Sequence, residues 1–327
     1  MLKLFTKLSL LMKLNLLSSL RQAGCASALF ATLLVLLIPV RLRAASEQGF
    51  NSPDDAVNAL VAAATHHDTN AMHAIFGPEG HQLASADAVQ ATNEFKMFAQ
   101  RLAEKTRWRT NSDLNFTLET GADGWPFPIP LVKQGDQWHF DTAAGKVEIL
   151  NRRIGMDELG AIDVCRAYVE AQREYASQDR TGDGVLAYAQ FLHSTPGKHD
   201  GLFWPAKPGE ALSPLGPLVA AARGEGYHRT ATMMNNEVAP YHGYFFKILT
   251  SQGKHAPCGR YDYIINGRMI AGFALVAWPA EWGNTGVMTF IVNQQGKVYQ
   301  CNLGKKTATI AAAMKAYDPD SRWTPAQ

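Results

Sequence analysis

Apolar residues recur at helical spacing between positions 50 and 105. Ser52 can cap a helix and Pro53 suits its first turn, while the acidic residues that follow suit the positive end of a helix. Ala56, Leu60 and Ala63 then recur at the spacing of one helical face. Two further helices are predicted over residues 71–76 and 86–105.

The pattern changes to the two-residue period of strands after position 114. Residues 115–120 alternate between polar and apolar side chains, and 129–133 forms a second predicted strand. Residues 134–137 are a predicted hairpin turn, from which 138–141 returns. Helices followed by a small antiparallel meander predict an N-terminal α+β domain over residues 46–147.

A long helix without proline, predicted over residues 148–178, opens a second domain at 148–327. Gly155 and Gly160 leave open whether this helix divides. An irregular stretch rich in Gly and Pro follows it at 195–236. Strands are then predicted over 244–249, 270–278, 287–292 and 297–300, and a short helix over 307–316.

The first 45 residues are typical of a secretory signal segment. They hold six basic residues and no acidic one, and the apolar run from Ala28 to Val40 is shorter than the roughly 20 residues of a spanning helix. Ala44 and Ala45 are small residues suited to cleavage, and an uncleaved anchor is the alternative. We expect a periplasmic or secreted protein that meets a membrane only through this segment.

Removal of the signal segment reverses the sign of the net charge. The whole chain has 31 basic and 29 acidic residues, for a formal charge of +2. Without the six basic residues of the signal, 25 basic residues remain against 29 acidic ones, which gives −4. Because no basic stripe is left to follow phosphates, nucleic acid is not an expected partner.

Seven segments between Gly135 and the end of the chain carry a resemblance to a known family. They are WHFDTAAGK at 138–146, RRIG at 152–155, AYVEAQREYA at 167–176, HDGLFWP at 199–205, SPLGPLVAAA at 213–222, GYFFKILTSQG at 243–253 and NGRMIAGFALVAWPAEWGNTGVMTFIVNQQGKVYQCNLG at 266–304. These segments resemble domain of unknown function 2950, found in exported bacterial proteins. The resemblance implies export and a shared fold, and it implies no activity.

The segments at 158–176, 243–250 and 272–299 also look like the globular part of type II secretion pseudopilins and type IV pilins. That likeness implies a long helix packed on an antiparallel sheet in the second domain. The prepilin cleavage site and long apolar helix of pilins are absent next to this module. A shared fold would therefore not imply polymerisation.

The best local motif for chemistry is DRTGDG at 179–184. Calcium loops of the EF-hand type place oxygen ligands at positions 1, 3, 5, 7, 9 and 12, with Gly at 6. The predicted ligands here are Asp179, Thr181, Asp183, the Val185 carbonyl and Gln190. Few negative charges predict weak affinity for Ca²⁺, which is the one cofactor that the sequence suggests. The alternative is an Asp/Gly turn whose side chains bond their own backbone.

Three cysteines remain beyond the signal segment. Cys165 lies in a helical pattern and is expected in the core. Cys258 and Cys301 lie in a predicted loop and at a strand end, and an oxidising compartment would permit a disulfide between them. Three free thiols are the alternative.

Trp278 and Trp282 are predicted to share one loop and to be exposed, which suits recognition of a carbohydrate or a protein. Core packing is the alternative for both. His193 and His199 flank a loop that contains Ser194 and Asp200, which supplies the residue types of a hydrolase triad. No G-x-S-x-G elbow accompanies them.

We expect an exported cell-envelope protein with a non-enzymatic binding or scaffolding role, whose partner is an envelope protein or a glycan. The sequence leaves open whether the chain is an enzyme, and it favours the answer no. One alternative is a hydrolase-type enzyme with a site in residues 193–236. The other is a pilus-like assembly component.

Overall fold

A computed structural model describes residues 47–206, 209–227 and 239–326, all within one compact unit, Ala44–Gln327. The predicted signal segment lies outside the described residues. The helices are α1 (Pro53–Thr65), α2 (Thr69–Phe76), η1 (Gly77–Leu83), α3 (Ala88–Glu104), α4 (Thr142–Ala176), α5 (Gly216–Gly224), η3 (Gly304–Lys306) and α6 (Thr307–Ala313). Within the described ranges, none of the helices combines the length and hydrophobicity that a membrane crossing needs.

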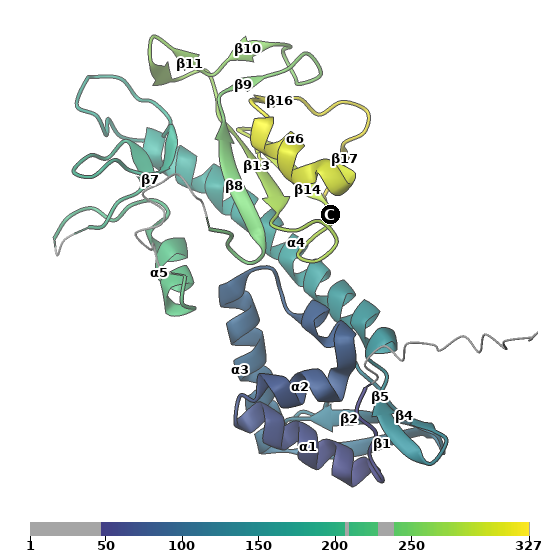
Figure 1. Cartoon of the computed structure of the whole chain (residues 1–327). Helices are drawn as coiled ribbons and strands as arrows, with labels where there is room; N and C mark the ends of the chain where they lie inside the picture. The colour runs from purple at the N-terminus through teal and green to yellow at the C-terminus, as the bar shows by residue number, and fades with distance from the viewer. Residues whose placement is uncertain (1–46, 207–208, 228–238, 327) are drawn as a thin grey trace, which may run out of the picture. The chain divides into compact units, whose positions relative to one another are not determined.

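Among the described residues, the strands form one larger sheet in each half of the unit, and the second half also has three small sheets (Figure 1). In the first half they are β1 (Thr106–Ser112), β2 (Asn115–Thr120), β3 (Trp125–Pro126), β4 (Leu131–Gln134) and β5 (Gln137–Phe140). In the second half they are β6 (Phe191–His193), β7 (Gly201–Phe203), β8 (Tyr244–Leu249), β9 (Ser251–Gln252), β10 (Tyr261–Asp262), β11 (Ile264–Ile265), β12 (Arg268–Met269), β13 (Ala274–Pro279), β14 (Thr289–Asn293), β15 (Tyr299–Cys301), β16 (Ala316–Tyr317) and β17 (Thr324–Pro325).

The first hydrophobic cluster lies between α1 to α3 and the antiparallel sheet of order β1-β2-β4-β5, in which β3 also pairs with β2. Helix α1 begins as predicted, because the Ser52 side chain accepts a hydrogen bond from the Asp55 N–H at 3.1 Å. Its inner face buries Leu60 completely, and Leu118 and Phe140 of the sheet are buried equally well.

The second cluster lies around the antiparallel sheet of order β17-β15-β14-β13-β8. All four residues from Ala274 to Ala277 in β13 are buried, so both faces of this strand are covered. Helices α4 and α6 both contact β13 (Figure 1). The Tyr168 hydroxyl of α4 donates to the Ala274 carbonyl at 3.2 Å, which fixes the helix to the strand. The fold class is therefore α+β, as predicted.

Helix α4 contributes to both clusters without a break at Gly155 or Gly160. Ile149 packs against the first cluster, whereas the residues from Ala161 onwards belong to the second. The division into domains 46–147 and 148–327 stays a prediction, and its boundary falls inside α4.

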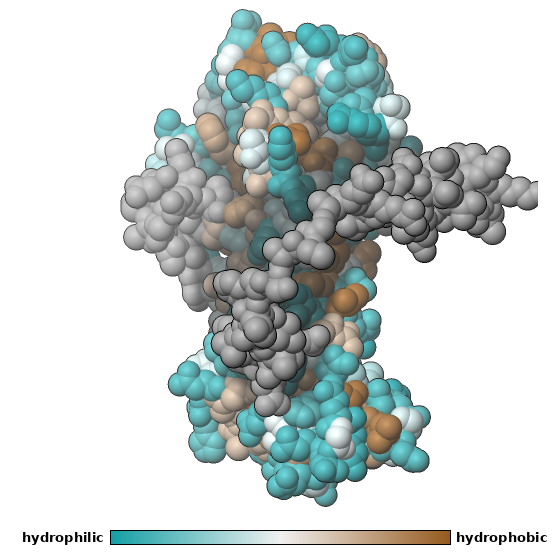
Figure 2. All heavy atoms as spheres, turned by 45° about the vertical axis from the view of Figure 1, so that its right-hand side comes forward, coloured by the Kyte–Doolittle hydropathy of each residue, from teal (hydrophilic) through white to brown (hydrophobic). Residues whose placement is uncertain are grey.

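Part of α4 faces solvent with apolar side chains. Val147, Met156 and Leu159 are each more than 60% exposed. In the face drawn in Figure 2, hydrophobic residues (brown) are exposed among hydrophilic ones (teal). Single exposed apolar residues are normal on a folded protein, and they do not define a site.

Candidate binding cleft

A surface cleft of about 500 Å³ lies where η1, α4 and the loop after β13 meet. We call it the Trp282 cleft. Residues 81–86 form its first wall, residues 281–284 form its second wall, and Lys146 and Leu150 of α4 lie between them. The lining residues are His81, Gln82, Ala84, Ser85, Ala86, Lys146, Leu150, Glu281, Trp282, Gly283 and Asn284.

The side chain of Asn284 joins the two walls of the Trp282 cleft. Its Oδ1 accepts a hydrogen bond from the Ala86 N–H at 3.0 Å, and its Nδ2 donates to the Ala84 carbonyl at 3.4 Å. The second wall is itself a turn, because the Asn284 and Thr285 N–H groups both donate to the Glu281 carbonyl. The cleft is thus built from hydrogen-bonded backbone rather than from long free loops.

The two predicted recognition tryptophans lie in different settings. Trp282 lines the cleft, is partly exposed, and donates from Nε1 to the Asn302 Oδ1 at 3.0 Å. The prediction of a shared loop is wrong for Trp278, which lies in β13 and packs its ring on Phe245 of the neighbouring strand at 5.7 Å. An aromatic pair across two strands stabilises a sheet, which gives Trp278 a structural contribution. Trp278 is also partly exposed, and a recognition role for it stays a prediction.

A buried polar network lies behind the first wall. The Asp87 Oδ1 accepts from the Val89 and Gln90 N–H groups and so caps α3. Its Oδ2 accepts from the Tyr227 hydroxyl at 2.9 Å and from the Gly243 N–H at 3.1 Å. One carboxylate, only 1% exposed, therefore connects the start of α3 with two segments more than 100 residues away.

Asp157 of α4 extends this network. Its Oδ1 accepts from the Gln90 Nε2 at 2.5 Å, while its Oδ2 has no hydrogen-bond partner. Burial raises the pKa of this carboxyl to about 7, and the negative charges of Glu94 and Asp87 act in the same direction. The sequence analysis missed Asp157, although its place four residues before the buried Ala161 was a signal of a polar group on a buried helix face.

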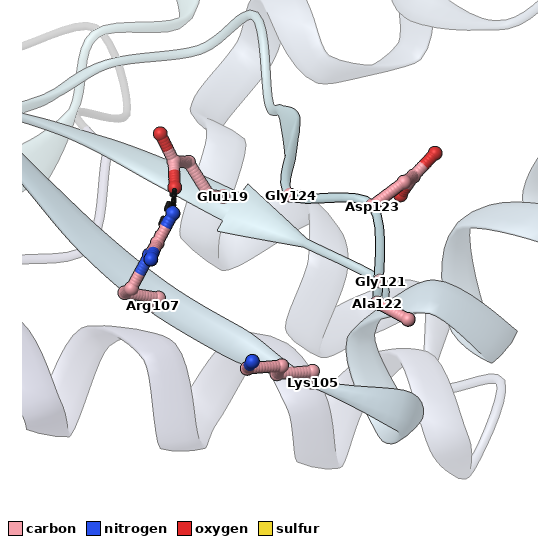
Figure 3. A pocket seen from close by; sticks show the side chains of 7 residues that line it. All are labelled: Lys105, Arg107, Glu119, Gly121, Ala122, Asp123 and Gly124. Atoms are coloured by element: carbon pink, nitrogen blue, oxygen red, sulfur yellow. Dashed lines mark hydrogen bonds and ion pairs between the residues drawn. The ribbon is translucent and has the colours of Figure 1, made fainter.

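A second depression lies over the N-terminal sheet and is lined by Lys105, Arg107, Glu119, Gly121, Ala122, Asp123 and Gly124 (Figure 3). Its volume is about 90 Å³. The Glu119 carboxylate accepts two hydrogen bonds from Arg107, and the Asp123 carboxylate pairs with Arg101 at 2.7 Å. Because these acidic groups already pair with arginine, this depression is a weaker candidate for a ligand site.

The predicted calcium loop forms a hydrogen-bonded turn. The Asp179 carboxylate accepts from the N–H groups of Thr181, Gly182 and Gly184, and these bonds hold its pKa below the usual range. Asp183 pairs with Arg268 at 2.8 Å, and the Gln190 Nε2 donates to the Gly267 carbonyl. Across the described ranges, no group of three or more His, Cys, Asp or Glu side chains is placed to hold a metal ion.

Calcium binding stays a prediction that calorimetric titration with calcium chloride can test. Because Ca²⁺ must compete with Arg268 for Asp183, we expect a dissociation constant of about a millimolar. Arg268→Ala removes this competitor, so it should tighten binding by about threefold or more. An absence of binding heat in both proteins at millimolar calcium would reject the site.

The triad residue types within the irregular stretch have structural partners. The Ser194 Oγ accepts from the Gly201 N–H at 3.0 Å and lies within hydrogen-bond distance of the Gly201 carbonyl. Both Asp200 carboxylate oxygens accept hydrogen bonds from Thr195. The His199 ring stacks on Trp204 at 4.4 Å. The hydrolase alternative gains no geometric support from these residues, and residues 207–208 and 228–238 of the stretch lie outside the described residues.

The three described cysteines are free thiols in this structure. Cys165 is fully buried in the second cluster, as predicted, and burial raises its pKa to about 12. Cys301 is buried at the end of β15 and Cys258 is exposed, and the predicted disulfide between them is not formed.

The fold and the cleft define a compact α+β protein in which a 35-residue helix packs on an antiparallel sheet beside a polar surface cleft. The chain belongs to the family described as "Protein of unknown function (DUF2950)", which it matches over residues 47–326. No curated protein and no solved structure matches it. The likeness to pseudopilins remains a resemblance of sequence.

Proposed function

We propose that the protein is exported to the cell envelope and binds a glycan, without catalysis, in the Trp282 cleft. The charge and hydropathy of the first 45 residues support export. The position of Trp282 in the cleft carries the binding proposal. An indole ring offers an apolar surface to the C–H face of a sugar, and its partial exposure leaves room for such a contact.

The polar side chains around Trp282 suit a ligand that is rich in hydroxyl groups. They are His81, Gln82, Lys146 and Glu281, of which Lys146 also donates to Gln82 and Glu79. This set includes both hydrogen-bond donors and acceptors, with one lysine and one glutamate. Because opposite charges are both represented, the cleft favours a polyhydroxylated ligand over a highly charged one.

The count of carboxylates in the cleft favours binding over hydrolysis. Among the described lining residues, Glu281 is the one carboxylate. Most glycoside hydrolases use a pair of Asp or Glu residues across the scissile bond. The cleft thus has the aromatic surface of a sugar site without the second acid of that mechanism.

Trp282→Ala should weaken oligosaccharide binding by about tenfold, because it removes the aromatic surface and leaves the polar groups in place. Isothermal titration of the full chain with chitotetraose, and separately with cellotetraose, measures the change. Trp282→Phe keeps an aromatic ring and should retain most of the affinity.

Trp278→Ala is the matched control, since Trp278 lies in β13 and does not line the cleft. Circular dichroism first establishes that the Trp278→Ala variant is folded. The affinity of this variant for the oligosaccharides should then equal that of the wild type. If neither sugar binds the wild type at millimolar concentration, or if Trp278→Ala weakens binding as much as Trp282→Ala, the proposal is wrong.

A further inference from the structure

The carboxyl group of Asp157 occupies an unusual position for an acidic side chain. It is 2% exposed, its Oδ1 has a single hydrogen bond, and its Oδ2 has none. An ionised carboxylate in such a place loses its hydration without full compensation, and the neutral acid loses much less. The site therefore distinguishes strongly between the two protonation states of Asp157.

The charged and titratable groups around Asp157 come from every element packed against it. They are Asp87 before α3, Glu94 in α3, Arg153 and Glu158 in α4, Tyr227 after α5, and Tyr244 in β8. Arg153 favours the ionised acid. Its Nε and Nη2 donate to Glu94 and to the Leu83 carbonyl, and its buried Nη1 has no hydrogen-bond partner among the described residues. The balance favours the neutral acid, and the pKa of Asp157 is raised to about 7.

Asp157 is connected to the first wall of the Trp282 cleft through two side chains. Gln90 donates to Asp157, and the Gln90 Oε1 accepts from the Ser85 Oγ at 2.5 Å. Ser85 is itself a lining residue of the cleft. A change of charge at Asp157 therefore acts on that wall through two consecutive hydrogen bonds.

Asp157 is also packed against the base of the second wall. A Cβ atom placed on Gly243 would lie 2.6 Å from the Asp157 Oδ2 and 2.7 Å from the Thr285 Cβ. The backbone at Gly243 thus fills the space between Asp157 and Thr285, which directly follows Asn284 of the cleft. The neighbouring Glu158 accepts from the Val287 and Met288 N–H groups at 2.9 Å, which holds the same loop on α4.

We propose that the proton on Asp157 controls how firmly the two walls of the Trp282 cleft are held together, and thereby the affinity of the cleft for its ligand. This inference rests on the proposed function. With neutral Asp157 the walls pack closely. When Asp157 ionises near Asp87 and Glu94, the carboxylate regains water only if these segments separate. The cleft then binds its ligand more weakly above neutral pH than below it.

Hydrogen exchange followed by mass spectrometry tests the wall movement without any ligand. The full chain is compared at about pH 5.5 and about pH 8.5, with peptides from 81–90 and 281–288 as reporters and peptides of β13 and β14 as internal reference. In the wild type, the protection factors of the reporter peptides should fall by about tenfold or more relative to those of the reference peptides as the pH rises. Asp157→Asn should abolish this pH dependence.

Asp163→Asn is the matched control, because Asp163 lies on α4, is exposed, and pairs with Arg166 at the surface. It should behave as the wild type does. Chitotetraose titration at the same two pH values then measures whether the affinity for the sugar decreases when the wall peptides lose protection. Equal protection of the reporters at both pH values in the wild type overturns the inference, whatever happens to Asp157→Asn.

The two proposals can fail separately. The reporter peptides could respond to pH through Asp157 in a protein that binds no sugar. That result would support the proposal that Asp157 controls the two walls, and it would reject the proposal that the cleft binds a glycan. Sugar binding with an affinity that is the same at both pH values would support the proposed function and overturn the inference.

Discussion

Gly145→Ala should destabilise the protein by about 2–3 kcal/mol. Gly145 lies in the first turns of α4, where the helix approaches the backbone before β4. A Cβ at this position would lie 2.5 Å from the Ile129 Cγ1 and 2.6 Å from the Ile129 Cα. Because Ile129 is fully buried and the contact includes its backbone, neither the helix nor Ile129 can move away without a cost in packing. Urea unfolding measures the loss.

Gly155→Ala is the control in the same helix, and it should have the opposite sign. No atom lies within 4 Å of a Cβ placed on Gly155, and the residue is exposed. Alanine should then stabilise the helix by about 0.5–1 kcal/mol, since it is the better helix former. If Gly145→Ala raised the urea midpoint, as Gly155→Ala should, then α4 would not pack on Ile129 as described.

Asp87→Ala should lower the free energy of unfolding by about 3–5 kcal/mol. The substitution removes the acceptor for four donors: the N–H groups of Val89, Gln90 and Gly243, and the Tyr227 hydroxyl. Because Asp87 is almost fully buried, water cannot replace the lost acceptor easily. Thermal and urea unfolding both measure the effect.

Asp68→Ala separates the capping role from the network. Asp68 caps α2 by accepting from the Ala71 N–H at 3.0 Å, and it is exposed. Its removal should cost about 1 kcal/mol, as for an ordinary cap. Asp87→Asn keeps one acceptor oxygen and should fall between the two alanine variants. Equal losses for Asp87→Ala and Asp68→Ala would mean that the contacts to Tyr227 and Gly243 add nothing.

The elements with a clear period were predicted closely. Residues 115–120 and 244–249 coincide with β2 and β8, and the Ser52 cap sets the start of α1. In α1 one face is buried and the other is exposed, so the helical period of the sequence reports the local structure directly. The buried positions of β2 and β8 do not alternate, so their periods located the strands but not a buried face.

Elements without a clear apolar period were missed or misplaced. Strand β1 has mostly exposed residues and no apolar alternation, and it is held by backbone pairing with β2. The start of α4 was predicted at 148, although Asp141 caps the helix by accepting from the Ala144 N–H. Gly145 lowers helix propensity there, and only its contact with Ile129 explains its presence.

The candidate site was predictable only in part. The partial exposure of Trp282 followed from its position in a loop, whereas Trp278 lies inside β13, which continues to Pro279, so its assignment to that loop was wrong. The polar network could not be predicted, since Gln90 and Asp157 are 67 positions apart and neither belongs to a motif. Such a pair is recognised only once the fold brings it together.

Because α4 is continuous, it also determines where along the chain residues can be inserted without disrupting the fold. One residue inserted into α4 between Arg153 and Ala161 would rotate every later side chain by about 100° about the helix axis. Tyr168 would then leave Ala274, and the face that packs on β13 would turn towards solvent. Exposed loops such as 195–198 tolerate added residues far better. We therefore expect length variation in relatives to spare α4 and to collect in the loops.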